Sequence, residues 1–539
     1  MRLFEFLERE SRQSYKTILV IAVISGLANT LLVAIANHAA EAVINQEGLA
    51  RYLLLYIISL TLFLQSQWLA FGRAVQLIED ALYSKRTRLT SKVAQLDLAY
   101  IDAVGSSRLY RRLTASDMLI SQAVPQLVAA SQIFALMVFS FVYLAYISPL
   151  TFLVTMAAFA GGVTLFMDQS RRNARELARV KSKEDDYSQS IAQLVDGFKE
   201  IKINRDKAAD LVEHIVAATA AAQAIKTEVA RKESRMWGFG RLFVYLLLPI
   251  ALFAIPTFTQ EPPDHLFKVS ALLFFLMGPI TILTATAPML TRVNHALDDL
   301  FQLEQDIDAV IARTGEMGAS GVDLTGFGRI AVEDMRFAFP GAGQNFSVGP
   351  FDQTIPRGEL LFIIGGNGSG KSTFLKLFTG LYFPDQGRIR VDDRVIGADD
   401  YAAYRGLFSV IFTDFHLFDR LYGIRDADPA QVDYWLDRMA LRDKVGYRDG
   451  GFSTRDLSTG QRKRLAFIAA MLEAKPILVL DEFAADQDPQ FRRYFYETIL
   501  PELKARGTTV IAVTHDDHYF HVADRILKMD EGRFVDPAS

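Results

Sequence analysis

The chain has 539 residues, of which 50% are hydrophobic, and its 58 Lys and Arg against 62 Asp and Glu give a formal net charge of −4. This length exceeds a single hydrophobic core and allows two large domains, and the slightly acidic balance excludes the basic surface typical of nucleic-acid-binding proteins. The sequence has no cysteine, which excludes disulfides, Cys-ligated zinc and thiol catalysis.

Long apolar segments crowd the N-terminal half of the chain. Six of them are long enough to cross the hydrocarbon core of a bilayer, about 30 Å thick, as helices. Buried helices of soluble proteins are usually shorter and more amphipathic, so we interpret these segments as membrane spans. The predicted spans are 17–37, 52–71, 127–147, 150–167, 238–256 and 267–290.

Basic residues indicate the orientation of these spans. Lys and Arg are frequent before the first span and in the long connections 72–126 and 168–237, whereas the two short loops are mostly acidic. The positive-inside rule therefore predicts that the N-terminus, both long connections and the C-terminal half are cytoplasmic. A plain bundle needs only short loops, so we expect the long connections to be helical extensions that contact another domain near 100–112 and 187–200.

The composition changes to Gly-rich and polar between residues 311 and 328. Beyond this stretch, apolar strand-like runs alternate with helical segments and glycine turns, which is typical of an α/β domain with a largely parallel sheet. The sequence therefore predicts a six-helix all-α transmembrane domain at 1–310, a linker at 311–328, and an α/β P-loop domain at 329–539.

A glycine-rich loop with the pattern GxxxxGKS lies between the apolar strand 360–364 and an apolar helix. This context suits a P-loop, because the glycines let consecutive backbone N–H groups turn toward phosphates at the helix N-terminus. We expect Lys371 to reach the β- and γ-phosphates of ATP and Ser372 to offer its hydroxyl to Mg²⁺. The predicted nucleotide-binding residues here are Gly365, Gly366, Asn367, Gly368, Ser369, Gly370, Lys371, Ser372 and Thr373.

Two adjacent carboxylates, Asp481 and Glu482, end the apolar run 477–480. An acidic pair after a strand is common and says little alone, but together with a P-loop it predicts a hydrolytic site. We expect Asp481 to hold Mg²⁺ through its water shell and Glu482 to polarise the attacking water.

Further positions could contact the nucleotide. Ser458 and the amide of Gly460, in the segment LSTGQ, precede a helix, where they could bind an anion or form an ordinary N-cap. His515 ends an apolar strand and could contact the γ-phosphate, although a lone histidine there is more often structural. Phe339 could stack on adenine or be an ordinary strand aromatic. The motif order favours the functional interpretation of LSTGQ and His515.

With these motifs in this order, the chain resembles the ABC transporter superfamily, exporter type, over its whole length. The resemblance implies two ATP molecules between two ABC ATPase domains, the P-loop coming from one and Ser458, Gly460 and Gln461 from the other. It therefore implies a homodimer in a lipid bilayer, with ATP and Mg²⁺ as cofactors. It also implies a D-loop at 485–489 that brings Asp488 to the nucleotide interface. The catalytic residues on this interpretation are Lys371, Glu482 and His515.

The ATPase half resembles a narrower group more closely. The run ADQDP followed by FRR, and the run HDDHYFHVADR, are similar to bacterial exporters of cyclic peptides and peptide siderophores. This resemblance implies ATP-driven export of peptide-like, amphipathic cargo across the bacterial inner membrane by alternating access. A lipid or multidrug flippase is an alternative. A membrane ATPase with a regulatory, non-transport role is another, and the six predicted spans argue against it.

Two positions depart from the family pattern. Thr413, with Asp414 beside it, replaces the glutamine that many ABC proteins place near Mg²⁺. Threonine is too short for that reach, so we expect Thr413 to orient a bridging water or to be a neutral strand-end residue. Thr459 stands where glycine is usual, which should be tolerated because Ser458 and Gly460 make the phosphate contacts.

Overall fold

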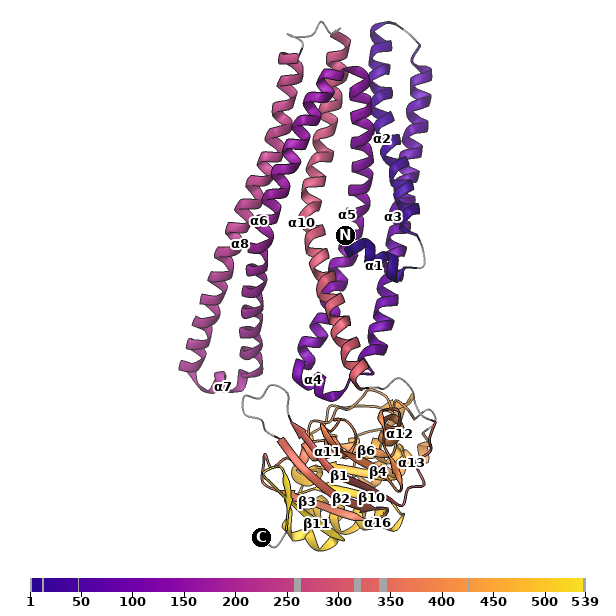
Figure 1. The fold of residues 1–539 in the computed structure, drawn as a ribbon, viewed down its shortest axis with the longest axis vertical. Coiled ribbons are helices and arrows are strands. Elements are labelled where there is room, and N and C mark those ends of the chain that lie inside the picture. Colours follow the sequence, from indigo (N-terminus) through magenta and orange to yellow (C-terminus); the bar gives the residue numbers. More distant parts are fainter. Residues whose placement is uncertain are drawn as a thin grey trace. The chain divides into compact units, whose positions relative to one another are not determined.

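The computed structural model describes residues 2–11, 14–46, 48–255, 263–314, 321–338, 347–424 and 427–536. The chain divides into two compact units (Figure 1). The first unit comprises Met1–Thr90 and Tyr110–Glu304, and the second comprises Ser91–Leu109 and Gln305–Ser539.

The first unit consists of long helices. Helices α6 and α8 pack side by side as a hairpin, and the short α7 joins them (Figure 1). Ser148 caps helix α6, because its hydroxyl accepts the Thr151 N–H, and Pro149 begins the helix at a position where a backbone N–H would have no partner in the helix. The helices are α1 (Arg2–Glu10), α2 (Tyr15–Ile44), α3 (Ala50–Val93), α5 (Ser106–Ile147), α6 (Pro149–Asp196), α7 (Phe198–Ile203), α8 (Arg205–Pro249) with the π-helical turn η1 (Ile250–Ala254), and α10 (Pro263–Thr314).

Among the described residues, four helices are long and apolar enough to cross a membrane: Tyr15–Ile44, Ala50–Val93, Ser106–Ile147 and His265–Leu283. They carry the first, second, third and most of the sixth predicted span. The predicted span 150–167 coincides with a shorter apolar stretch, Pro149–Leu165. The predicted span 238–256 falls on the end of α8 and on η1 and extends to Pro256, which lies outside the described residues.

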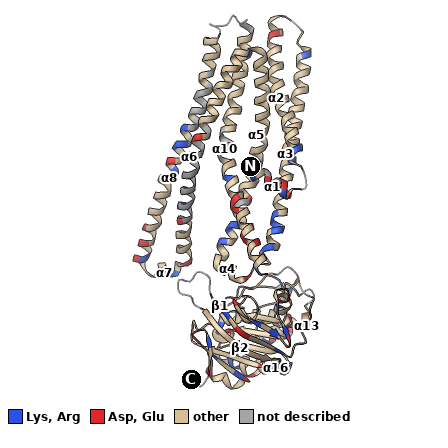
Figure 2. Ribbon diagram, viewed as in Figure 1, with Lys and Arg blue, Asp and Glu red and all other residues tan. Residues whose placement is uncertain are grey.

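The surface of these helices fits a lipid environment. Leu53 and Leu54 of α3 expose 62% and 61% of their surface, and Val142 of α5 exposes 63%. Charged residues of α3 and α10 gather toward one end of each helix, and a long central stretch of both is nearly free of them (Figure 2). An apolar surface of this extent is expected where a helix meets lipid.

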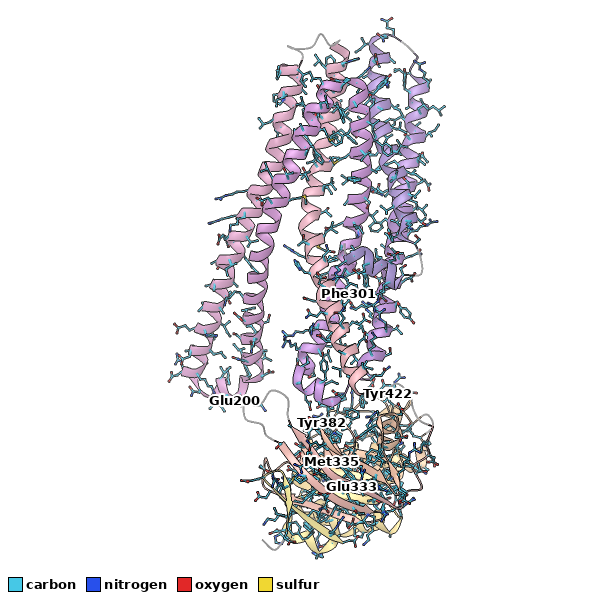
Figure 3. The ribbon with its side chains drawn as sticks, in the orientation of Figure 1. Glu200, Phe301, Glu333, Met335, Tyr382 and Tyr422 are labelled. Carbon is cyan, nitrogen blue, oxygen red and sulfur yellow. The ribbon has the colours of Figure 1, made fainter. Side chains whose placement is uncertain are left out.

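Helix α1 packs on the first unit through an apolar face. Leu3, Phe6 and Leu7 are buried with α3 and α10 side chains. The guanidinium groups of Arg2 and Arg9 lie over the ring of Phe301 on α10, a residue that Figure 3 labels. The N-terminal segment is therefore an amphipathic helix anchored to the bundle.

The second unit contains two principal sheets. An antiparallel sheet has the order β2-β1-β4-β5, and a six-stranded sheet has the order β12-β11-β3-β10-β9-β6, in which β12 alone is antiparallel. A two-stranded hairpin pairs β7 with β8. The strands are β1 (Arg329–Ala338), β2 (Ser347–Pro356), β3 (Leu360–Gly365), β4 (Gln386–Val391), β5 (Arg394–Val395), β6 (Phe408–Ile411), β7 (Tyr447–Arg448), β8 (Gly451–Phe452), β9 (Ile477–Asp481), β10 (Thr509–Val513), β11 (Arg525–Asp530) and β12 (Arg533–Val535).

The six-stranded sheet is buried on both faces. In β3, Leu361 and Ile363 belong to one core cluster and Leu360 and Phe362 to the other, because side chains alternate along a strand. Parallel strands that are covered on both faces consist of consecutive apolar residues, as β3 does.

The helices of this unit are α11 (Lys371–Phe378), α12 (Tyr401–Arg405), α13 (Pro429–Arg438), α14 (Thr459–Leu472), α15 (Pro489–Tyr494) and α16 (Leu500–Ala505). The π-helical η4 (Phe495–Ile499) precedes α16, and the 3-10 turns are η2 (Ala398–Asp400), η3 (Phe483–Asp486) and η5 (Asp517–Val522).

The second unit also includes α4 (Leu98–Val104), from the first long connection. Leu98 and Ala99 pack against the core cluster that contains Phe374 and Phe378. Asp102 accepts hydrogen bonds from Lys376 Nζ at 3.0 Å and from the Tyr382 hydroxyl at 2.6 Å. The contact predicted near 100–112 is thus confirmed for α4, and the one near 187–200 stays a prediction.

Candidate nucleotide site

The loop between β3 and α11 has the conformation that glycine permits. Gly370 has φ 103°, and a Cβ there would lie 3.2 Å from the Val348 side chain. Gly366, Asn367 and Gly368 form an exposed tip. The loop therefore offers accessible backbone N–H groups at the start of a helix, the geometry that binds phosphate.

Lys371 folds back over this loop. Its Nζ donates to the carbonyl oxygens of Gly365 and Gly366, at 3.0 Å each, and the residue is only 6% exposed. The ammonium therefore lies where it can exchange a carbonyl partner for a phosphate oxygen. Ser369 Oγ is buried without a hydrogen-bond partner, so a second polar group of the loop remains available to a ligand.

Asp481 ends β9 beside this loop. Its Oδ2 accepts a hydrogen bond from Ser372 Oγ at 2.8 Å and another from Thr413 Oγ1 at 3.3 Å. Burial raises the pKa of Asp481, and the charge of Glu482 adds to this, while the bond from Ser372 acts in the opposite direction. Thr413 therefore contacts Asp481 directly, a bond that the sequence alone did not predict.

The chemistry of this corner fits Mg²⁺. Asp481 Oδ1 is buried and has no hydrogen-bond partner, and Ser372 supplies a hydroxyl to the same carboxylate. No group of three or more His, Cys, Asp or Glu that could hold a metal occurs among the residues that the structure describes. Mg²⁺ usually binds one or two protein oxygens together with water and substrate phosphates, and Asp481 with Ser372 matches that requirement.

Glu482 and His515 lie against each other. His515 Nε2 is 3.2 Å from Glu482 Oε1, and both side chains are partly exposed. Glu482 adopts the left-handed conformation, with φ 51° and ψ 40°, and its N–H donates to the Val513 carbonyl of β10 at 3.1 Å. The two predicted catalytic groups therefore follow adjacent parallel strands and meet at one edge of the sheet.

The segment LSTGQ begins α14. Ser458 and Gln461 form a capping box, each side chain paired with the other's backbone N–H. Ser458 and Thr459 are nevertheless exposed. A Cβ on Gly460 would lie 2.5 Å from the Asp486 carbonyl oxygen, so this position needs glycine for packing. Ser458 thus caps its own helix and still presents its surface to a ligand.

Asp488 has a structural role in the D-loop. Its carboxylate accepts the Phe491 N–H at 2.9 Å, capping α15, and pairs with Arg464 at 2.6 Å. The Phe491 N–H holds the pKa of Asp488 below its usual range, and Arg464 contributes. Phe339 lies outside the described residues, so its predicted adenine contact stays a prediction.

Sequence reasoning missed several polar residues that surround these motifs. Lys463 contacts the backbone of Glu482, Gln487 donates to the Gly460 carbonyl, and Arg492 joins the D-loop carbonyls to Asp516. The available signal was the run of basic residues at 462–464. A helix that packs on a sheet must bury part of such a run.

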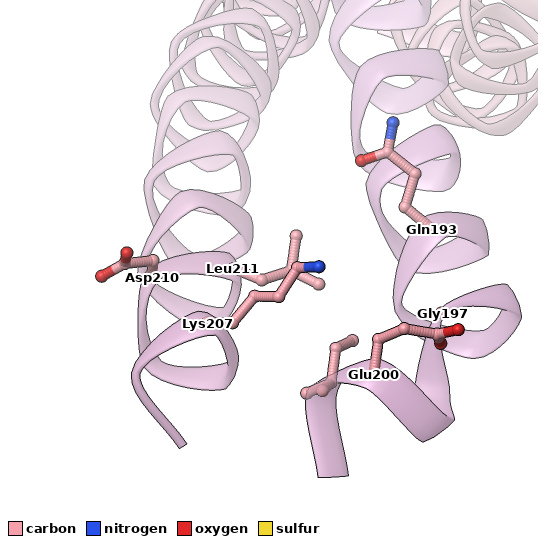
Figure 4. A pocket seen from close by; sticks show the side chains of 7 residues that line it. Gln193, Gly197, Glu200, Lys207, Asp210 and Leu211 are labelled. Atoms are coloured by element: carbon pink, nitrogen blue, oxygen red, sulfur yellow. The ribbon is translucent and has the colours of Figure 1, made fainter. Parts of the chain in front are cut away.

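A separate cleft of about 480 Å³ lies in the first unit, where α6, α7 and α8 meet (Figure 4). Its lining mixes charged and apolar side chains, including Glu200, Lys207 and Leu211. None of the predicted nucleotide-handling residues that the structure describes lines it.

Comparison with known proteins identifies the family. A family profile described as ABC transporter matches residues 348–485. The chain is 33% identical over 545 residues to ATP-binding protein SyrD of Pseudomonas syringae pv. syringae, covering 96% of this chain and 93% of that protein. It is 24% identical over 380 residues to the ATP-dependent lipid A-core flippase of Chromohalobacter salexigens, covering 68% of this chain and 64% of the flippase. It is 29% identical over 291 residues to the mycobactin import ATP-binding/permease protein IrtB of Mycolicibacterium thermoresistibile, covering 51% of this chain and 48% of IrtB.

A solved structure shows the same fold. A bacterial Atm1-family ABC exporter with ATP bound superimposes with a TM-score of 0.79 at 18% identity, covering 96% of this chain and 93% of the exporter chain. The chain therefore belongs to the ABC transporter family, as an exporter-type protein that joins a membrane-spanning helical region to an ABC ATPase domain and couples ATP hydrolysis to transport.

Proposed function

We propose that this protein is a homodimeric exporter of a cyclic or modified peptide, or a peptide siderophore, across the bacterial inner membrane. In this proposal it has six spans, with its ATPase domain and N-terminus in the cytoplasm. The observation that carries the ATPase part is the meeting of Lys371, Ser372, Asp481 and Glu482 at the carboxyl ends of β3 and β9. Ligands of open α/β sheets bind at such ends.

The residues divide the hydrolytic work among them. Lys371 leaves its loop carbonyls and binds the β- and γ-phosphates of ATP, and Ser372 and Asp481 hold the metal corner. Glu482 orients the attacking water and accepts its proton, while His515, beside Glu482, contacts the γ-phosphate. Mg²⁺, when bound, supplies positive charge that neutralises the phosphates. Thr413 keeps the Asp481 carboxylate in place through its hydroxyl.

A second copy of the chain completes each site. Ser458 is the exposed cap of α14 and Gly460 lies half-buried in its first turn, and helix N-termini attract phosphate. In the proposed dimer this end of the helix faces the P-loop of the partner, so one ATP is enclosed by two subunits. Asp488, in the adjacent D-loop, then lies at the same interface.

In this proposal, the long connections transmit the closure of the ATPase domains to the membrane-spanning helices. Asp102 of α4 bonds to Lys376 and Tyr382, and Lys376 lies on the helix that begins with Lys371. Closure of the ATPase domains around ATP therefore pulls on α4, and α4 connects α3 to α5, two of the predicted spans.

Polar groups inside the helical bundle favour a transported substrate that forms hydrogen bonds, such as a peptide. Ser25 Oγ on α2 and both Gln132 Nε2 and Ser140 Oγ on α5 are buried without hydrogen-bond partners. Buried polar groups in membrane helices usually serve a pathway or a helix contact. A lipid substrate is the alternative, since a relative is named a lipid A-core flippase.

Transport assays distinguish these functions. Inside-out vesicles that contain the protein should accumulate a labelled cyclic peptide in the presence of ATP and Mg²⁺, and vesicles with Glu482→Gln should not. ATP-dependent flipping of a fluorescent lipid without peptide uptake would favour the flippase. ATP hydrolysis with neither peptide nor lipid movement would favour a regulatory ATPase.

A further inference from the structure

A buried lysine contacts the backbone of the proposed hydrolytic carboxylate. The side chain of Lys463, on α14, is 4% exposed. Its Nζ donates to the Glu482 carbonyl oxygen at 2.8 Å and pairs with the Asp486 carboxylate at 2.7 Å. A buried ammonium is costly unless it is paired and hydrogen-bonded, and both partners of Lys463 belong to the segment that follows β9.

Glu482 needs support at this backbone. Its left-handed conformation is unfavourable for a residue with a side chain, and such strain persists only where the surroundings enforce it. The Val513 carbonyl accepts the Glu482 N–H at 3.1 Å, and Lys463 binds the carbonyl on the other side of the residue. Both peptide groups of Glu482 are therefore held, which fixes the direction of its side chain toward His515.

We infer that Lys463 is a positioning residue for ATP hydrolysis, holding Glu482 in the conformation that presents its carboxylate to the attacking water. This inference rests on the proposed role of Glu482. Lys463 touches neither the carboxylate nor His515 in the structure, so it acts through the backbone of Glu482 alone.

The same contact ties the hydrolytic group to the LSTGQ helix. Lys463 is on α14, which begins at Thr459, and Gln487 adds a second link by donating to the Gly460 carbonyl at 3.0 Å. A displacement of α14 is therefore transmitted to Glu482. In the proposed dimer, α14 and Glu482 of one subunit serve different ATP molecules, so this contact links the two sites.

Substitution of Lys463 tests the inference, because a positioning role should change kcat for ATP but not KM. Lys463→Met removes the donor and keeps most of the volume. Because a misplacement of about 1 Å can cost on the order of 100-fold in rate, we expect kcat for ATP to fall by at least roughly 10-fold while KM stays within about twofold. A merely structural role would instead lower the folded fraction, with KM and kcat unchanged per folded molecule.

Two further variants separate the carbonyl bond from the ion pair. Lys463→Gln retains an N–H donor without charge and should recover a large part of kcat. Asp486→Asn removes the ion pair but leaves the bond to Glu482, and should lower kcat much less than Lys463→Met does. Arg493→Met, which removes an exposed pair with Glu497, is the matched control and should change neither constant.

The outcomes are distinguishable. Wild-type kcat in folded Lys463→Met, or a loss in Asp486→Asn equal to that in Lys463→Met, would overturn the inference. If Lys463→Met does not fold, Lys463→Gln decides: kcat near wild type supports the carbonyl bond, and a fall in kcat of roughly 10-fold or more in folded Lys463→Gln contradicts it. Glu482→Gln is measured alongside, and undiminished hydrolysis in that variant would refute the proposed role of Glu482 itself.

Discussion

Ser372 and Asp481 are joined by a hydrogen bond of 2.8 Å between Ser372 Oγ and Asp481 Oδ2. The bond connects the first turn of α11 to the end of β9, elements that are about a hundred residues apart in the sequence and meet only in the folded sheet. It brings the P-loop and the acidic strand end together. The remaining oxygen of Asp481 is buried and without a hydrogen-bond partner, which suits the proposed Mg²⁺ site.

Thr413 donates to the same Asp481 oxygen at 3.3 Å. We expect Thr413→Val to lower the hydrolysis rate at saturating ATP by roughly tenfold with little change in ATP affinity, since loss of a hydrogen bond to a carboxylate costs about 1.5 kcal/mol at the low end of its range. Thr413→Gln should be tolerated, because its amide can reach the corner. ATPase rates at a series of Mg²⁺ concentrations check this, and a wild-type rate for Thr413→Val would leave Thr413 as a neutral strand-end residue.

Asp102 anchors α4 to the ATPase core. Burial acts to lower the pKa of Lys376, but its bonds to Asp102 and Tyr382 outweigh that effect and raise it, so the ion pair persists at neutral and mildly alkaline pH. We expect Asp102→Ala to increase amide hydrogen exchange across residues 98–104. Arg388→Met, which removes the surface pair with Glu333, should leave this exchange unchanged. Equal protection of α4 in Asp102→Ala and wild type would show that the apolar contacts of Leu98 and Ala99 suffice.

Asp488 caps α15, and its ionised form should stabilise the ATPase domain. Its pKa is lowered in the fold, so this contribution is complete above the ordinary Asp pKa, near 3.9, and is lost as pH falls through the lower folded value. We expect Asp488→Ala to cost about 1 kcal/mol at pH 7. Thermal unfolding of wild type and Asp488→Ala between pH 7 and pH 3.5 checks this pH dependence. The difference in free energy of unfolding between the two proteins should stay constant down to about pH 4 and then shrink. A difference that grows on acidification would be incompatible with a depressed pKa.

Much of the nucleotide site could be predicted from the sequence, because its parts are local patterns at the carboxyl ends of strands. The P-loop after β3, Asp481 at the end of β9 and His515 after β10 need only the rule that parallel strands end at one edge. The contact of α4 was predictable in outline, since a long polar connection has no role in a plain bundle.

Other features depend on tertiary packing. The left-handed backbone of Glu482 has no sequence signal, because a glutamate rarely adopts it. The bond from Lys463 to Glu482 joins a helix and a strand end whose proximity no local pattern encodes. Likewise, no local pattern shows that the folded loop brings the Thr413 hydroxyl directly to Asp481, and the bridging water expected at Thr413 stays a prediction.

Mixed dimers provide the most direct test of the central claim, that each ATP is enclosed by the P-loop of one subunit and the LSTGQ segment of its partner. One dimer pairs a Lys371→Ala subunit with a Ser458→Arg subunit, so that both changes fall in one site. The other pairs a subunit carrying both changes with a wild-type subunit, so that each site carries one change. Tandem affinity tags isolate each mixed dimer, and bound ATP per dimer is measured. The account predicts one tightly enclosed ATP in the first dimer and none in the second. Equal ATP content in the two dimers, or full ATPase activity in an isolated monomer, would contradict it.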